Sequence, residues 1–170
     1  MKHLKKLISF AVILVAFTTA AFAQASATSS AAATIVGPIG IANTTPMNFG
    51  NVAVSATVPG TVVLTPAGAR STTGGVTLPA TTGTVAAAVF NVTGADGYTY
   101  AITLPATPTT ISFGAINMTV DTFTSTPSGT GSLAGGSQTL SVGATLNVAA
   151  AQAAGTYTSA TPFTVTVNYN

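Results

Sequence analysis

The chain closes on Pro162-Phe163-Thr164-Val165-Thr166-Val167-Asn168-Tyr169-Asn170, in which apolar and polar side chains alternate. A period of two places successive side chains on opposite faces of an extended strand. The apolar face carries Phe163, Val165, Val167 and Tyr169. Burial of such a face contributes about 1.5–3 kcal/mol for each large side chain. We therefore expect this stretch to be a terminal strand of the hydrophobic core.

Short alternating stretches of the same kind recur through the preceding sequence, separated by Gly and Pro, and no 3.6-residue apolar period is sustained. The predicted strands span residues 60–65, 84–92, 98–104, 116–124, 138–148 and 163–169. Regularly spaced short strands are typical of an antiparallel β-sandwich. The sequence therefore predicts a single all-β domain over residues 34–170, an immunoglobulin-like sandwich.

Two local patterns add detail to this prediction. Asp96-Gly97 predicts a type I′ hairpin turn, which needs positive φ at both central residues. Gly155-Thr156-Tyr157 places a Tyr before the closing strand, similar to the tyrosine corner of immunoglobulin-like sandwiches.

The N-terminus has the pattern of a secretory signal peptide over residues 1–23. Lys2, Lys5 and Lys6 precede an apolar stretch, and Ala21-Phe22-Ala23 fits the small-x-small cleavage rule. The alternative is an N-terminal anchor helix, but a span needs about 20 apolar residues. We expect cleavage before Gln24, with no stable membrane span afterwards. Residues 24–33 are small and polar and predict a flexible leader.

The next segment, residues 34–41, has apolar or small residues at alternate positions. These are Ile35, Gly37, Ile39 and Ile41. Pro38 cannot donate to a β-ladder, so a strand here belongs at an edge or a junction. One alternative is the first strand of the chain's own sheet. The other is a donor strand that completes a neighbouring subunit by β-augmentation.

Charge is almost absent beyond residue 23, where the sequence has no His, Cys, Lys, Glu or Trp. The charged side chains that remain are Arg70, Asp96 and Asp121. General acid–base catalysis, thiol chemistry and most metal binding depend on the missing residue types. We therefore expect no enzyme activity, no cofactor and no metal. Nucleic-acid binding is not expected either, because no basic patch remains.

Arg70 and Asp121 are the candidates for an ion pair, since an Asp121 facing inward would need a partner and Arg70 is the cation available. The alternative is that both side chains are solvated, because a surface ion pair contributes only about 0–1 kcal/mol. Asp96 is explained by the predicted turn.

Several stretches together resemble the bacterial family called domain of unknown function 4402. They include Met47-Asn48-Phe49-Gly50, Leu64-Thr65-Pro66-Ala67-Gly68-Ala69-Arg70, Phe90-Asn91-Val92-Thr93-Gly94 and the terminal Val165-Thr166-Val167-Asn168-Tyr169. The resemblance implies an all-β protein exported by a Gram-negative bacterium, without established catalytic residues. The C-terminal pattern is also similar to spore coat U and chaperone–usher pilin proteins. That likeness implies an incomplete immunoglobulin-like fold, completed by a partner's N-terminal strand.

These observations favour a non-enzymatic, exported structural subunit that assembles on the bacterial surface by strand pairing. Soluble sheets commonly protect exposed edges with Lys and other charges, and this sequence has almost none after residue 23. The alternative is a secreted binding or adhesion module that recognises a glycan or host surface through its loops. We expect either protein in the periplasm, on the cell surface or outside the cell.

Overall fold

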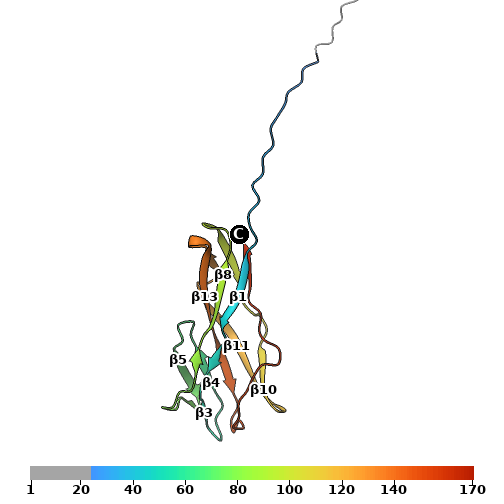
Figure 1. Ribbon diagram of the computed structural model, residues 1–170. Coiled ribbons are helices and arrows are strands. Elements are labelled where there is room, and N and C mark those ends of the chain that lie inside the picture. The colour runs from blue at the N-terminus through green and yellow to red at the C-terminus, as the bar shows by residue number, and fades with distance from the viewer. Residues whose placement is uncertain (1–23) are drawn as a thin grey trace, which may run out of the picture. The chain divides into compact units, whose positions relative to one another are not determined.

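The computed structural model describes residues 24–170, and the predicted signal peptide lies outside them. The chain divides into two compact units, with the boundary between Ile35 and Val36. In the first unit the described residues, 24–35, form no helix or strand, and all are exposed. The second unit, Val36–Asn170, holds every strand found among residues 24–170 (Figure 1). Among residues 24–170 we find no helix with the length and apolarity to cross a membrane.

The larger sheet has seven antiparallel strands. Five follow one another across it in the order β1 (Gly40–Thr45), β8 (Ala88–Thr93), β13 (Ser137–Val148), β11 (Ile116–Thr126) and β10 (Thr109–Phe113). The other two extend it from β13 as β4 (Gly60–Leu64) and β5 (Arg70–Gly74). The central strand β13 is 12 residues long. Its first half pairs with β8 and its second half with β4, so two strands share its length.

The smaller sheet has three strands, in the order β12 (Thr130–Ser132), β9 (Thr99–Thr103) and β14 (Thr166–Tyr169). Two short ribbons complete the fold. They are β2 (Asn48–Phe49) with β7 (Val85–Ala86), and β3 (Ala53–Val54) with β6 (Val76–Thr77). A single 3-10 turn, Ala134–Gly136, is the one helical element in the described part of the chain. The predicted all-β antiparallel sandwich is therefore confirmed.

Two hydrophobic clusters lie along β13. The first, at its C-terminal half, is formed by Phe49, Val62, Leu64, Val76, Val120, Ala144, Leu146 and Val148. The second lies where the larger sheet faces the three-stranded sheet, and is formed by Ala88, Val92, Tyr100, Leu133, Leu140, Val142, Val165 and Val167. Along β13 the buried side chains fall on every second residue from Leu140 to Val148, as the period of two predicts.

Several boundaries differ from the sequence prediction. The stretch 84–92 divides into β7 and β8, and the terminal strand begins at Thr166 rather than at residue 163. The first strand begins at Gly40, later than the predicted segment 34–41. It pairs with β8 of its own chain, so Gly40 and Ile41 are the residues of the predicted segment that join the chain's own sheet.

The predicted hairpin at Asp96-Gly97 is wrong. The strands on either side, β8 and β9, lie in different sheets. The turn therefore carries the chain from the seven-stranded sheet to the three-stranded sheet. Gly97 has a φ of 77°, but Asp96 is not in the positive-φ region that a type I′ turn requires. The Asp96 carboxylate instead accepts a hydrogen bond from the Gly135 N–H at 2.7 Å, which ties this crossing to the 3-10 turn.

Candidate functional site: an open seam between the sheets

The terminal strand β14 has an unpaired edge. It pairs with β9 alone, with Asn168 opposite Ala101. The Asn170 N–H donates to the Thr99 carbonyl at 3.2 Å. Hydrogen-bonded pairs alternate along an antiparallel ladder, so the N–H and C=O of Val167 and Tyr169 point to the opposite side. No described strand pairs with β14 on that side.

A second unpaired edge lies beside the first. Strand β1 pairs with β8 alone, and it contacts β14 without belonging to the same sheet. Figure 1 shows the C-terminus beside the start of β1. We call the two facing edges of β1 and β14 the open seam.

The inner side of the open seam is apolar and well packed. Val165 and Val167 are each 7% exposed, and Ile39 and Ile41 pack against the same cluster. Phe163 contacts Phe90 and Phe123, with ring centroids 6.5 and 4.9 Å away. The predicted apolar face of the terminal stretch is therefore directed at the core, with its two valines buried and Phe163 and Tyr169 partly buried.

One end of the open seam is closed by Tyr169. Its hydroxyl donates to the Gly37 carbonyl at 3.1 Å and accepts from the Ala95 N–H at 2.7 Å. A Cβ at Gly94 would collide with this hydroxyl, so the close approach requires glycine. Sequence reasoning missed these bonds. Their partners are 132 and 74 residues away, and no local pattern signals a contact over that distance.

The alternating residues of the predicted N-terminal strand lie in different environments. Ile35 is 96% exposed and belongs to the first unit. Gly37 is exposed but holds Tyr169 through its carbonyl, whereas Ile39 and Ile41 pack against the second cluster. The expected alternation therefore contributes to the core only from Ile39 onward.

Strands β5, β12 and β10 also have free edges, and each of them has protection that β14 lacks. Strand β5 begins at Arg70, the one cation among residues 24–170. Strand β12 is three residues long, and β10 follows Pro108 and is bridged at Ser112 by Thr158. Charge, shortness, proline and coverage are the usual protections of a sheet edge. In contrast, β14 contains no charged residue and no proline.

The expected ion pair between Arg70 and Asp121 is not formed. The Arg70 Nη1 donates to the carbonyls of Phe49 and Asn51 at 2.6 and 3.0 Å. Asp121 accepts from the Asn147 side chain at 2.8 Å and from the Thr122 hydroxyl at 3.0 Å. Each side chain thus has neutral partners close in space. Arg70 pins the loop after β2 to the start of β5, which is a structural role.

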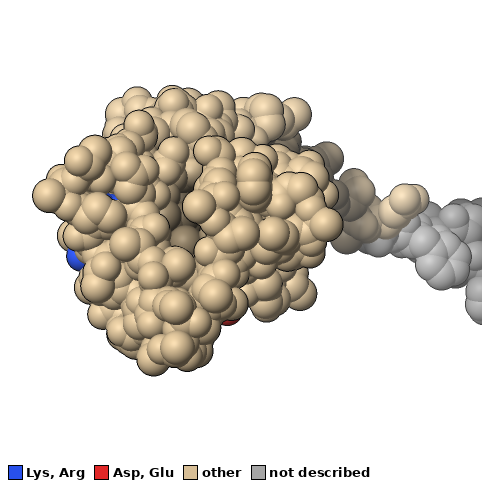
Figure 2. All heavy atoms as spheres, turned by 90° about the horizontal axis from the view of Figure 1, so that it is seen from below, with Lys and Arg blue, Asp and Glu red and all other residues tan. Residues whose placement is uncertain are grey.

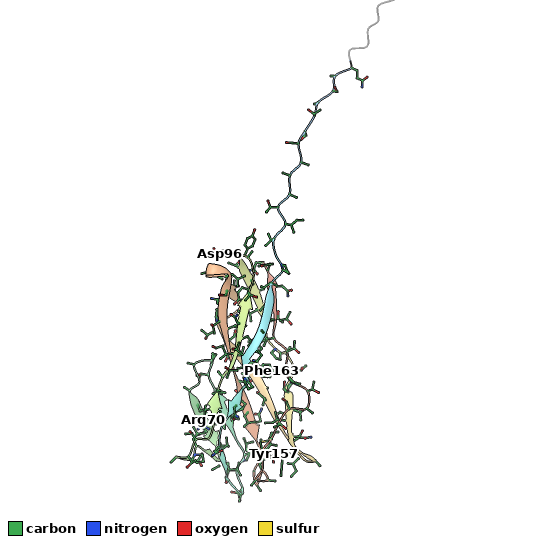
Figure 3. All side chains as sticks on the ribbon, in the orientation of Figure 1. Arg70, Asp96, Tyr157 and Phe163 are labelled. Carbon is green, nitrogen blue, oxygen red and sulfur yellow. The ribbon has the colours of Figure 1, made fainter. Side chains whose placement is uncertain are left out.

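Charge is sparse on the surface as well. Figure 2 shows one face of the molecule that is almost entirely free of charged atoms. Arg70 and Asp96 lie toward opposite ends of the domain, with Phe163 between them (Figure 3). Among residues 24–170 there is no group of three His, Cys, Asp or Glu that would hold a metal ion.

Tyr157 has the hydrogen bond of a tyrosine corner. Its hydroxyl donates to the Ala153 carbonyl, four residues upstream, at 2.8 Å and accepts from Gln152 at 2.9 Å. Its ring packs on Phe113 at 5.8 Å. This places Thr158 where it bridges β10, so the predicted motif covers an edge of the larger sheet.

Tyr100 lies at the centre of the second cluster with no exposed surface. Its hydroxyl donates to Gln138 at 2.8 Å, and burial raises the pKa of the phenol. The folded state thus keeps the proton to higher pH than the unfolded chain, whose tyrosines titrate near pH 10. The stability that this difference contributes is present below about pH 10 and is lost as pH rises further.

We expect the urea midpoint to fall between about pH 10 and 11, and to fall less steeply in Tyr100→Phe. Unfolding curves followed by circular dichroism at pH 8, 10 and 11 measure both slopes. Equal slopes in the two proteins would show that Tyr100 does not contribute to the loss of stability at high pH.

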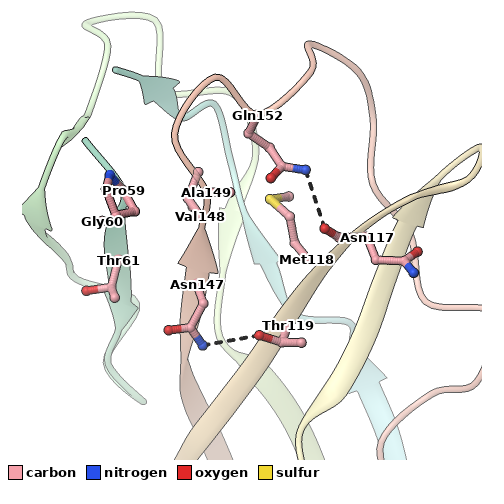
Figure 4. Close-up of a pocket in the computed structure, with 10 residues that line it drawn as sticks. All are labelled: Pro59, Gly60, Thr61, Asn117, Met118, Thr119, Asn147, Val148, Ala149 and Gln152. Atoms are coloured by element: carbon pink, nitrogen blue, oxygen red, sulfur yellow. Dashed lines mark hydrogen bonds between the residues drawn. The ribbon is translucent and has the colours of Figure 1, made fainter. Parts of the chain in front are cut away.

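An open hollow of about 510 Å³ lies at the C-terminal end of β13 (Figure 4). Its polar side chains are Thr61, Asn117, Thr119, Asn147 and Gln152. Gln152 donates to the Asn117 carbonyl at 3.4 Å. Amides and hydroxyls of this kind hydrogen-bond neutral polar ligands, but the hollow contains no charged or aromatic side chain.

Comparison with known proteins assigns the family. No curated protein and no solved structure matches the chain significantly. The family model described as Domain of unknown function (DUF4402) matches residues 39–169, which include every strand of the sandwich. The chain belongs to the DUF4402 family.

Proposed function

We propose that this chain is a non-enzymatic, exported structural subunit that self-associates into a surface assembly by pairing of edge strands. The unpaired edge of β14 is the observation that carries the proposal. Its N–H and C=O groups at Val167 and Tyr169 are available to another strand, and neither charge nor proline protects them.

The chemical composition supports the same role. Beyond residue 23 the chain has no His, Cys, Lys or Glu, and its few charged side chains are dispersed. A domain with so little charge has little electrostatic repulsion to oppose association. The signal-peptide pattern at residues 1–23 and the resemblance to pilin-like proteins support export to the surface of a Gram-negative cell.

A charged side chain on the β14 edge tests this proposal. Asn168 is exposed, so Asn168→Lys adds a charge without entering the core. We expect the protein exported from the full chain to form oligomers that grow with concentration, and Asn168→Lys to stay monomeric with an unchanged urea midpoint. Size-exclusion chromatography with light scattering measures both proteins.

The matched control is Ser71→Lys, which adds the same charge to an exposed position on β5 and should leave assembly intact. A protein that remains monomeric at all concentrations would contradict the proposal. Equal assembly of Asn168→Lys and the unsubstituted protein would also contradict it.

The hollow at the end of β13 favours a second candidate, a secreted binding module for neutral glycans. Asn117 and Gln152 would supply the amide hydrogen bonds. Calorimetric titration with a panel of neutral oligosaccharides tests it. Binding that Gln152→Ala weakens would support this candidate. A titration that gives no heat of binding would contradict it.

A further inference from the structure

We infer that the hollow at the C-terminal end of β13 recognises uncharged sugars through their hydroxyl hydrogens, because two fixed side-chain amides present only oxygen to it. The inference rests on the glycan-binding candidate of the proposed function and names the groups of the ligand that are read. The two amides belong to Asn147 and Gln152, which both line the hollow (Figure 4). We call Asn147 Oδ1 and Gln152 Oε1 the two amide oxygens.

The amide of Asn147 is held in one orientation by Asp121. Its Nδ2 carries two hydrogens, and it donates to Asp121 Oδ2 at 2.8 Å and to the Thr119 hydroxyl at 3.4 Å. A carboxylate accepts hydrogen bonds and donates none, so a rotated amide would bring Oδ1 against Oδ2 with no hydrogen between them. Figure 4 shows Oδ1 on the other side, toward Thr61, which also lines the hollow.

The amide of Gln152 is held in the same way. Its Nε2 donates to the Tyr157 hydroxyl at 2.9 Å and to the Asn117 carbonyl at 3.4 Å. The Tyr157 hydroxyl gives its own hydrogen to the Ala153 carbonyl at 2.8 Å, so toward Gln152 it can only accept. Both hydrogens of Nε2 are therefore used, and Figure 4 shows Oε1 on the side of Met118, another residue that lines the hollow.

The two amide oxygens are free and accessible. Both residues are half-buried, and no described residue donates to Asn147 Oδ1 or Gln152 Oε1. Among residues 24–170 no buried side-chain nitrogen or oxygen lacks a partner, so an oxygen without one must reach solvent. A ligand in the hollow can therefore donate a hydrogen bond to each of them.

The rest of the hollow fits a sugar. Its volume of about 510 Å³ lies within the range of about 300–1,000 Å³ that is usual for small-ligand pockets. Pro59, Met118 and Val148 offer apolar surface to the C–H groups of a ring, and no charged side chain lines the hollow. A ligand whose polar atoms are all acceptors would leave the two amide oxygens without a hydrogen, whereas sugar hydroxyls supply one.

Deoxyfluoro sugars test the inference, because fluorine is close to a hydroxyl in size but donates no hydrogen bond. Calorimetric titration of the exported full chain begins with cellobiose, lactose and mannobiose. In the disaccharide that binds, each hydroxyl is then replaced in turn by fluorine. We expect the affinity to fall about fivefold or more for at least two of these analogues, because each amide oxygen loses its donor.

Alanine variants connect each sensitive hydroxyl to its amide oxygen. Asn147→Ala should abolish one fluorine effect and keep the other, and Gln152→Ala should do the reverse, as in a double-mutant cycle. The matched control is Asn91→Ala, which removes an exposed amide on β8 outside the hollow. This control should leave every affinity within about twofold. Urea midpoints show whether each variant is folded.

Asp121→Asn tests the positioning of Asn147. An amide at residue 121 can donate as well as accept, so it allows the Asn147 amide to rotate. We expect the fluorine effect that depends on Asn147 to shrink, although Asp121 does not line the hollow. A purely structural role for Asp121 would change the urea midpoint and leave the ratio of the two affinities, for sugar and analogue, unchanged.

Equal binding of the parent disaccharide and all its deoxyfluoro analogues would overturn the inference, as would fluorine effects that persist in both alanine variants. Either result would leave glycan binding standing, and only the inference would fall. An absence of binding by all three disaccharides would contradict the inference and the glycan-binding candidate together. Assembly through β14 is tested separately by Asn168→Lys.

Discussion

Removal of residues 166–170 is expected to abolish cooperative folding. This deletion takes away β14, so β9 keeps only the three-residue strand β12 as a neighbour. It also removes Val167, which is 7% exposed, and Tyr169, whose hydroxyl holds Gly37 and Ala95. Lost burial and lost hydrogen bonds together amount to about 5 kcal/mol or more, which is comparable to the whole stability of many domains.

Circular dichroism and urea unfolding of the shortened chain measure this effect. The expected result is a gradual transition without the baseline of a native state. Deletion of residues 24–35 is the control, because these residues are all exposed and belong to a separate unit. That deletion should leave the urea midpoint of the monomer unchanged. A cooperative transition at the original midpoint after removal of 166–170 would contradict the assignment of β14 to the core.

The strands were predictable where burial on one face imposes a period of two. Along β13 and β14 the alternation is regular, and the buried residues Leu146 and Val167 fall on the expected face. Where the sequence has Pro or several small residues, the alternation is weaker. Pro38 is one example, and the first strand begins two residues after it rather than four residues before it.

Pairing partners were not predictable in the same way. Asp96-Gly97 has the composition of a hairpin turn, but whether the flanking strands pair depends on which sheet each one joins. That choice is made by contacts distant in sequence, such as the bond from the Gly135 N–H to Asp96. Arg70 gives a second case. Its charge predicted an ion pair with Asp121. The Arg70 guanidinium instead donates to the carbonyls of Phe49 and Asn51, which satisfy the same donor group.

The candidate site was predictable only in part, for a related reason. The alternation of residues 163–169 identifies β14 as a strand with an apolar face. Its unpaired edge is a property of the sheet order, which no local pattern contains. An absence of charge along the chain indicates unprotected edges in general, and the structure is needed to say which of them is open.

Gly143→Ala is expected to destabilise the domain by about 1–3 kcal/mol or more, although alanine is a small residue. Gly143 lies at the junction on β13 where pairing with β8 ends at Val142 and pairing with β4 begins at Ala144. On the opposite edge, the ladder with β11 shifts register between Gly143 and Thr145. The chain leaving β4 passes so close here that a Cβ would collide with the Leu64 carbonyl oxygen.

This collision is difficult to relieve because the opposing atoms belong to the backbone. A flexible side chain would rotate away, but the Leu64 carbonyl moves only with β4, and Leu64 is a fully buried member of the first cluster. Urea unfolding of Gly143→Ala and of Gly37→Ala gives the comparison. A Cβ at Gly37 meets nothing within 4 Å, so that variant should stay within about 0.5 kcal/mol of the original protein. Equal midpoints for the two variants would show that β4 and β8 do not meet end to end against β13 as closely as the structure places them.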